Sequence, residues 1–228
     1  MNNIRPALLM MFRDEVDILE QTLTHWRDLG IQRFYLCDNN SKDSSADIAA
    51  KFADTVRMEY RTNWPASDVI NTLKADAQRD GYNWIFPVDA DEQIALPEGC
   101  DDLYDYIRYL DVKTDFAIIE LDYLNIYPNG KQYIQGTHRK VFGKFRSNWE
   151  IAMGNHLIIN NPPTHDAKGA YYKHYGIRGY DQFRTKMINY MEAFNQMPFP
   201  DHPHAQSYRL WKFQGESYIE QLYQNMLA

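Results

Sequence analysis

Residues 84–92 read WIFPVDADE, an uninterrupted apolar run that ends in three carboxylates. An apolar run without alternation is typical of a strand buried on both faces, as in a parallel sheet covered by helices. Open α/β sheets bind their ligands beyond the carboxyl ends of the strands. Alternate residues of an extended chain face the same side, so we expect Asp89 and Asp91 to converge there and Glu92 to point away.

The segments before this run repeat the same alternation of strand and helix. Apolar strands are expected at about 7–12, 33–37 and 56–60, and amphipathic helices at about 14–30, 44–52 and 67–81. Asp14 and Ser67 are candidate N-caps, and Gly30 is a candidate stop. Such alternation predicts an α/β fold, Rossmann-like, with a mostly parallel sheet and helices on both faces.

The pattern changes after residue 115. We expect a strand at 116–121, another near 123–127, a turn at 128–130, and short strands and loops over 131–175. Two helices, at about 179–195 and 205–227, are expected to close the chain, and they predict a C-terminal helical extension.

Composition narrows the class of protein. The 228 residues are 44% hydrophobic and 14% aromatic, with two cysteines and a formal net charge of −7. No apolar run reaches the roughly 18 residues of a transmembrane helix, and the N-terminus does not resemble a signal peptide. These features indicate a soluble, cytoplasmic protein, and its acidity argues against a nucleic-acid partner.

The charge is unevenly distributed. Residues 1–137 hold 13 Lys and Arg against 24 Asp and Glu, a balance of −11, whereas 138–228 hold 11 against 7, a balance of +4. Six of the seven histidines lie in the second part. An acidic part facing a basic part suits a site for a metal ion and phosphate, although a solvated surface can show the same imbalance.

Three groups of residues can carry chemistry. Asp89 and Asp91 offer hard oxygen ligands for Mg²⁺ or Mn²⁺, unless they belong to an ordinary acidic turn. Asp38, in a loop of turn formers, can accept hydrogen bonds from a base or ribose, or simply stabilise the turn. His156, His174 and the neighbouring Lys140 and Arg178 can complete a metal shell or neutralise a diphosphate, although a lone histidine is more often structural. The sequence holds neither a dinucleotide-binding glycine motif nor a P-loop.

Four segments together resemble family 2-like glycosyltransferases, in the subgroup related to family 92. They are residues 13–43, which include Arg13 and Glu15, then 84–92, then Gly154-Asn155-His156, and then 174–186 with His174, Arg178, Gln182 and Lys186. The likeness covers roughly residues 7–190, and Gly179 and Gln93 depart from the usual residues of the group.

The resemblance implies a GT-A fold over residues 1–195, with a nucleotide-binding half at about 1–115 and an acceptor-side half at about 116–195, followed by the extension at 196–228. It implies a nucleotide-sugar donor, with uridine as the expected base, and Mn²⁺ or Mg²⁺ as cofactor. Seven residues would bind the donor: Arg13, Glu15, Asp38, Asp89, Lys140, His156 and Arg178. Asp91 and His174 would bind the metal, with Asp89 as a further candidate ligand.

The expected reaction is transfer of the sugar to a hydroxyl of a glycan or other acceptor, with inversion. Glu150 is the first candidate for the general base and Asp122 the second. Two alternatives use the same acidic strand end: a Mg²⁺-dependent nucleotidyl- or phosphotransferase, and a non-catalytic module that binds nucleotides or glycans.

Overall fold

The computed structural model describes residues 4–53, 56–58, 66–111, 118–152, 155–160, 163–195 and 203–228. The chain forms two compact units. The sheet unit holds residues 1–60, 65–124 and 134–174, and the helical unit holds 61–64, 125–133 and 175–228. The boundaries of these units differ from the boundary at residue 195 that the sequence suggested for the glycosyltransferase-like domain. That domain boundary stays a prediction. No helix in the described ranges is long and apolar enough to cross a membrane.

Four parallel strands form one end of the sheet, in the order β3 (Val56–Met58), β2 (Arg33–Asp38), β1 (Pro6–Phe12) and β4 (Trp84–Pro87). β1 is the innermost of them and its residues are almost entirely buried. The predicted parallel strands are therefore confirmed, including the apolar run that precedes the acidic residues.

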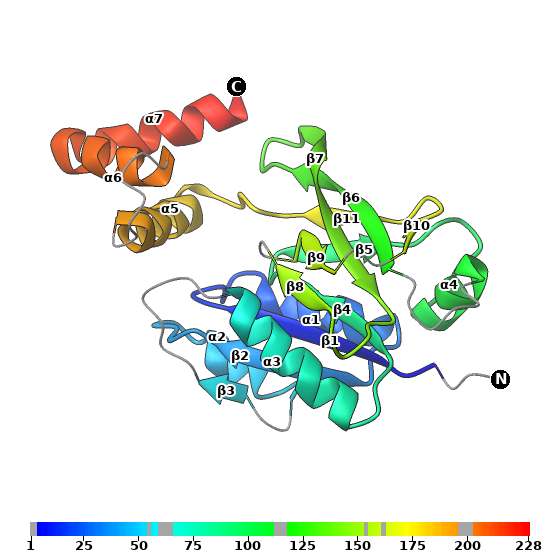
Figure 1. Ribbon diagram of the computed structural model, residues 1–228. Coiled ribbons are helices and arrows are strands. Elements are labelled where there is room, and N and C mark those ends of the chain that lie inside the picture. Colours follow the sequence, from blue (N-terminus) through cyan, green and yellow to red (C-terminus); the bar gives the residue numbers. More distant parts are fainter. Residues whose placement is uncertain are drawn as a thin grey trace. The chain divides into compact units, whose positions relative to one another are not determined.

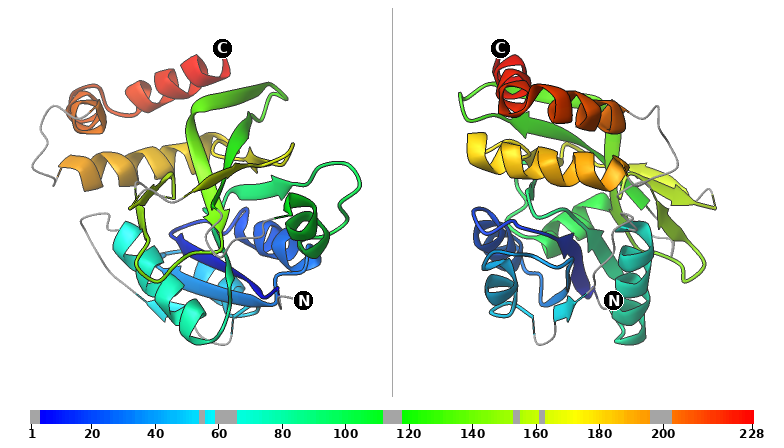
Figure 2. Two further views of the ribbon diagram at one scale, coloured as in Figure 1. Left: turned by 45° about the vertical axis from the view of Figure 1, so that its right-hand side comes forward. Right: turned by 90° about the vertical axis from the view of Figure 1, so that its left-hand side faces the viewer.

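Helices cover both faces of these strands, as predicted. Figure 1 shows β1 between α3 and α1, and the right view of Figure 2 separates α3 from α1 and α2. Leu8 and Met10 of β1 join one hydrophobic core, and Leu9 joins the other. The first core includes residues of α1 (Leu19–Asp28), α2 (Ser45–Ala49) and α4 (Leu103–Leu110), and the second includes residues of α3 (Ala66–Arg79).

The sheet continues beyond β4 with strands from the second half of the chain. β7 (Gln132–Gly143) pairs antiparallel with β4, and β6 (Ile118–Ile126), β11 (Tyr171–His174) and β5 (Glu92–Ala95) follow in that order. β10 (Thr164–Asp166) pairs with β6, while β8 (Glu150–Ala152) and β9 (Leu157–Ile159) form a separate hairpin. β6 replaces the two short strands expected at 116–127, of which residues 116 and 117 lie outside the described residues.

The helical unit contains α5 (Tyr180–Asn195), α6 (Pro203–Gln214) and α7 (Glu216–Leu227) around a small core of Ile177, Phe183, Met191 and Ile219. A single helix over 205–227 was expected, and this prediction is wrong. Gly215 separates α6 from α7 with φ +69° and ψ −149°, a backbone conformation that favours glycine.

Two predicted helix caps are also wrong. α1 begins at Leu19 rather than after Asp14, whose φ of +54° places it in the loop, where its carboxylate bonds to another loop. Ser67 lies inside α3, which already begins at Ala66. Gly30, with φ +102°, does follow the end of α1, as expected.

Candidate functional site

The parallel strands bring the ends of β1, β2 and β4 to one side of the sheet, which we call the carboxyl edge. Phe12 pairs with Asp38, and the backbone N–H of Asn39 donates to the carbonyl of Phe12 at 2.9 Å. Leu9 pairs with Pro87, so β4 ends beside β1. The candidate residues Arg13, Asp38 and Asp89 therefore lie at the ends of neighbouring strands, as the sequence predicted for Asp38 and Asp89.

The loops after β1 and β2 are tied together. The N–H of Asp14 donates to Oγ of Ser41 at 3.0 Å, and the N–H of Lys42 donates back to Oδ1 of Asp14 at 2.6 Å. The N–H of Glu15 donates to Oγ of Ser45 at 2.9 Å. These exchanged bonds hold the half-buried Glu15 and the buried Asp38 in one interlocked pair of loops.

Asp38 is fully buried at the carboxyl edge. Its Oδ1 accepts hydrogen bonds from the backbone N–H of Ser41 at 3.0 Å and from its hydroxyl at 2.5 Å. Within the described part of the chain, Oδ2 of Asp38 is buried without a hydrogen-bond partner, whereas Nε of Arg13 lies 3.5 Å from Oδ2 of Asp14 in an ion pair. Buried polar atoms are costly to leave unsatisfied, so this pair of loops retains one acceptor, Oδ2 of Asp38, for a ligand.

Residues 89–92 form a turn rather than an extended segment. The N–H of Glu92 donates to the carbonyl of Asp89 at 3.1 Å, and the N–H of Asp89 donates to Oε2 of Glu92 at 2.9 Å. The expectation that Glu92 points away from Asp89 is therefore wrong, because alternation of side chains holds only while the backbone stays extended.

Lys140, on β7, joins these two carboxylates. Its Nζ lies 2.6 Å from Oδ2 of Asp89 and 3.0 Å from Oε1 of Glu92, and the lysine is 1% exposed. Burial by itself lowers the pKa of Lys140, but the charges of Asp89 and Glu92 outweigh it and raise the pKa above its ordinary value. The ammonium is therefore charged and oriented toward Asp89, whose side chain is 47% exposed.

Glu92 is the buried partner of this cluster. Burial, together with the charges of Asp89 and Asp91, raises the pKa of Glu92 to about 8, while Lys140 opposes the shift. Nε1 of Trp26 donates to the carbonyl of Glu92 at 3.0 Å and fixes the backbone at this point. The turn thus exposes the carboxylate of Asp89 and buries that of Glu92, which is fixed by its contacts.

Asn155 also contacts Asp89, and the sequence did not single it out as a site residue. Its Nδ2 lies 3.3 Å from Oδ1 of Asp89, and its φ of +72° is a conformation that asparagine tolerates better than most residues. Its place before His156 in the Gly154-Asn155-His156 segment was the available signal. His156 is half-buried next to it.

Asp91 and His174 come together across β5 and β11. His174 pairs with Glu92 in the antiparallel register, and its Nε2 lies 3.7 Å from Oδ1 of Asp91. Two protein ligands of one divalent ion lie about 3 Å apart at bond lengths of about 2.1 Å, so a carboxylate and an imidazole in this position fit a metal ion. Among the described residues no group of three or more His, Cys, Asp and Glu side chains is placed to hold a metal ion.

The remaining candidates lie on separate elements. Asp122 is half-buried in β6, and Glu150 is exposed at the start of β8. Burial lowers the pKa of Lys74, and the charge of Glu150 opposes this shift. Arg178 belongs to the helical unit, where its Nη1 donates to the carbonyl of Tyr175 at 2.9 Å.

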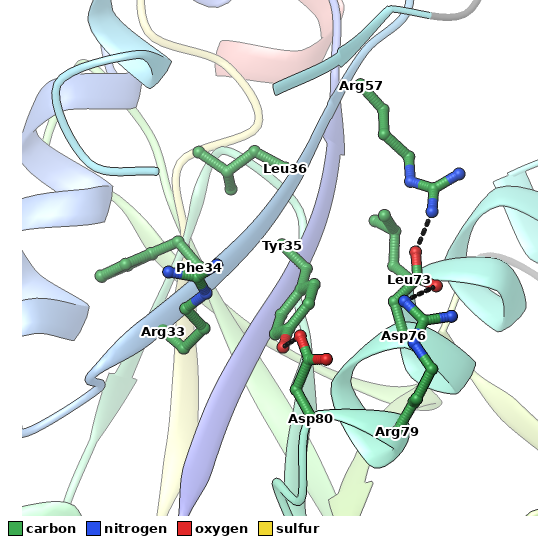
Figure 3. Close-up of a pocket in the computed structure, with 9 residues that line it drawn as sticks. All are labelled: Arg33, Phe34, Tyr35, Leu36, Arg57, Leu73, Asp76, Arg79 and Asp80. Carbon is green, nitrogen blue, oxygen red and sulfur yellow. Dashed lines mark hydrogen bonds and ion pairs between the residues drawn. The ribbon is translucent and has the colours of Figure 1, made fainter. Parts of the chain in front are cut away.

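A pocket of about 200 Å³ lies elsewhere in the sheet unit, between β2, β3 and α3 (Figure 3). Asp76 pairs there with Arg57 and with Arg79, and the hydroxyl of Tyr35 donates to Oδ2 of Asp80 at 2.6 Å. None of the site residues predicted from the sequence lines it. Asp76 of α3 thus pairs with Arg57 of β3, and Asp80 bonds to Tyr35 of β2, which indicates a structural role in joining α3 to the sheet.

No family model and no curated protein matches this chain. Among solved structures, TarS of S. aureus (residues 1–349) has a TM-score of 0.49 at 13% identity, over 89% of this chain and 68% of that one. A manganese complex of Rv0371C from Mycobacterium tuberculosis H37Rv has a TM-score of 0.43 at 11% identity, over 81% and 97%. The inositol-1-phosphate CTP transferase of T. maritima has a TM-score of 0.39 at 9% identity, over 85% and 97%. Likenesses this distant carry no conclusion about activity, so the function has to be inferred from the site.

Proposed function

We propose that the protein is a family 2-like glycosyltransferase, of the subgroup related to family 92, that uses a divalent metal ion. It moves a sugar from a uridine-diphosphate sugar to a hydroxyl of a glycan or other acceptor, with inversion. One observation carries the proposal: the interlocked loops around Asp38 follow β1 and β2, and the turn that holds Asp91 follows β4 at the same carboxyl edge, where His174 of β11 lies next to Asp91. This edge is where open α/β sheets bind nucleotides.

The nucleoside part of the donor binds at the interlocked loops. Asp38 offers Oδ2 as an acceptor for the base or ribose. Arg13, whose Nε lies 3.5 Å from Oδ2 of Asp14, contacts the donor through the rest of its guanidinium in this proposal. Glu15 holds the loop through its backbone. His156 contacts the diphosphate end of the donor in this proposal, and the donor contact expected for Arg178 stays a prediction from the sequence.

Asp91 and His174 hold Mn²⁺ or Mg²⁺. When bound, the ion supplies positive charge beside the leaving diphosphate. Asp89 faces the ribose or the donor sugar. Its carboxylate is held by the ammonium of Lys140 and by the side-chain amide of Asn155. The burial of Lys140 favours this positioning role over the direct diphosphate contact that the sequence suggested.

Glu150 takes the proton of the acceptor hydroxyl, with Asp122 as the alternative base. Glu150 is exposed on the β8–β9 hairpin, where an acceptor can reach it. Removal of this proton as the acceptor oxygen attacks the sugar carbon completes the transfer and releases a nucleoside diphosphate.

Thermal stability in the presence of ligands tests the site. Uridine diphosphate with Mn²⁺ should raise the melting temperature by more than the sum of the separate shifts, with a coupling of at least about 1 kcal/mol if the two share a site. Asp91→Asn should remove this coupling, whereas Asp101→Asn, at an exposed position outside the site, should retain it. Strictly additive shifts would contradict a shared site.

A product assay tests the reaction. Incubation with uridine-diphosphate sugars and Mn²⁺ should release uridine diphosphate. Release of pyrophosphate from a nucleoside triphosphate would instead identify a nucleotidyltransferase. Metal-coupled binding without turnover of any nucleotide sugar, in the presence of varied acceptors, would identify a binding module.

A further inference from the structure

Glu150 lies between two buried residues. Trp149 and Ile151 are 4% and 1% exposed and belong to the hydrophobic core that includes residues of α3, whereas Glu150 itself is exposed. Alternate side chains of a strand face opposite sides, so Glu150 of β8 faces away from the core that Ile151 joins. The backbone on either side of Glu150 is therefore anchored by burial, while its carboxylate stays accessible.

Helix α3, which lies beside β8 in Figure 1, also binds the backbone at this point through Asn71. Nδ2 of Asn71 donates to the carbonyl of Ile151 at 2.8 Å, and the N–H of Ile151 donates to Oδ1 of Asn71 at 2.9 Å. One side-chain amide thus satisfies both backbone groups of the residue that follows Glu150, with one donor and one acceptor, as a neighbouring strand would.

Asn71 is itself held in place, and a second residue of α3 holds the other side of Glu150. Nδ2 of Asn71 also donates to the carbonyl of Ser67, one turn earlier in α3, at 2.9 Å. The buried Lys74 donates from Nζ to the carbonyl of Trp149. Asn71 and Lys74 are three positions apart and so lie on one side of the helix. The residues before and after Glu150 are therefore both hydrogen-bonded to α3.

We propose that Asn71 is a positioning residue for Glu150, an inference that rests on the proposed role of Glu150 as the general base. Proton transfer needs the base within hydrogen-bond reach of the acceptor hydroxyl, at about 2.6–3.2 Å between heavy atoms. A base keeps such a position when its backbone is held by contacts that do not depend on the substrate. Asn71 supplies two such contacts at the next residue, so its loss should slow transfer and leave donor binding intact.

Kinetics of Asn71→Ala test the proposal on the full chain. Release of uridine diphosphate from uridine-diphosphate sugars should slow at least ~10-fold, since a small misplacement of a catalytic group is costly. The Kd for uridine diphosphate with Mn²⁺ should stay unchanged. Combined with Glu150→Gln, Asn71→Ala should cause no further loss of rate, because a residue that acts through Glu150 has no effect once the base is gone.

Gln78→Ala is the matched control, because Gln78 of α3 binds the same segment farther from Glu150. Nε2 of Gln78 donates to the carbonyl of Phe145 at 2.7 Å. Gln78→Ala should lower the melting temperature about as much as Asn71→Ala and keep the transfer rate of the parent. Asn71→Asp retains an acceptor for the N–H of Ile151, so its rate should lie between those of the parent and Asn71→Ala. Asn71→Asp carries the test if Asn71→Ala does not fold.

The possible outcomes separate this inference from the proposed function. The positioning role alone is overturned if Glu150→Gln is slow while Asn71→Ala is fully active, or if the losses of the two variants multiply. It is equally overturned if Gln78→Ala slows transfer as much as Asn71→Ala. Full activity of Glu150→Gln, or no release of uridine diphosphate by the parent protein, would instead overturn the proposed base and this inference with it.

Discussion

Lys140 holds Asp89 from inside the protein: the lysine is 1% exposed, its Nζ lies 2.6 Å from Oδ2 of Asp89, and that carboxylate is 47% exposed. A buried cation thus fixes the direction of a side chain that remains accessible to a ligand. The same ammonium lies 3.0 Å from Glu92, so its removal affects the core and the site together.

Lys140→Met should lower the free energy of unfolding by about 3 kcal/mol, because removing one partner of a buried pair leaves the other uncompensated. Urea denaturation measures this change. Lys140→Met combined with Glu92→Gln should recover part of the loss, and Lys51→Met, at an exposed position, is the control. Equal stability of the parent and Lys140→Met would contradict the buried pair.

Substitutions of the two proposed metal ligands, Asp91 and His174, should weaken donor binding to different extents. Asp91→Ala should abolish metal-dependent binding of the donor, whereas His174→Ala should weaken it, because imidazole is a poorer ligand than carboxylate for Mn²⁺. The metal requirement of His174→Ala should also become steeper at low pH, since the remaining ligands compete with protons for a weakly held ion. Titration calorimetry with Mn²⁺ and uridine diphosphate measures both. A crystal with both ligands in which His174 lies more than about 5 Å from the ion would exclude it as a ligand.

Glu150→Gln should retain donor binding and slow transfer by ~10²-fold or more, the usual scale for loss of a general base. Donor binding and turnover are measured on the same preparation. Full activity of Glu150→Gln together with an inactive Asp122→Asn would assign the base to Asp122.

The pKa of Glu92 predicts a pH dependence of stability. Its ordinary value is 4.5 and the folded protein raises it to about 8, so the folded state binds the proton more tightly than the unfolded state between these values. The free energy of unfolding should therefore fall as pH rises from about 4.5 to about 8, by about 1.4 kcal/mol for each unit of pKa difference at most. Denaturation in the presence of a chelator should show this fall, and Glu92→Gln should reduce it, while Glu98→Gln at an exposed position should not.

Two buried tyrosines should respond differently to loss of the hydroxyl. The hydroxyl of Tyr106 donates to the carbonyl of Ala167 at 2.7 Å, so Tyr106→Phe should cost about 1 kcal/mol. The hydroxyl of Tyr172 is buried with no partner among the residues that the structure describes, so Tyr172→Phe should be neutral or stabilising by up to about 1 kcal/mol. Thermal denaturation compares the pair. A larger loss for Tyr172→Phe than for Tyr106→Phe would show that Tyr172 does have a partner.

The parallel part of the fold was predictable because its signals are local. The apolar runs at 7–12 and 84–88 need burial on both faces, and helices between parallel strands supply it. The same reasoning placed Asp38 and Asp89 at the carboxyl edge, since parallel strands end on the same side.

The contacts within the site were not predictable, because they depend on distant parts of the chain. Lys140 is 51 residues from Asp89, and Asn155 is 66 residues away. The position of Glu92 was missed because residues 89–92 turn, and β5 was missed because Glu92–Ala95 is short and mixed in polarity. The end of α6 depends on the conformation of Gly215, and a glycine late in a helical pattern does not by itself specify a break.

The exchanged hydrogen bonds between the loops after β1 and β2 have an evolutionary consequence. The N–H of Asp14 depends on the hydroxyl of Ser41, and the N–H of Lys42 depends on the carboxylate of Asp14. A substitution at either position leaves a group of the other loop unsatisfied, so natural variants should change positions 14 and 41 together or keep both. The two loops, 27 residues apart in sequence, should therefore evolve as one inherited unit.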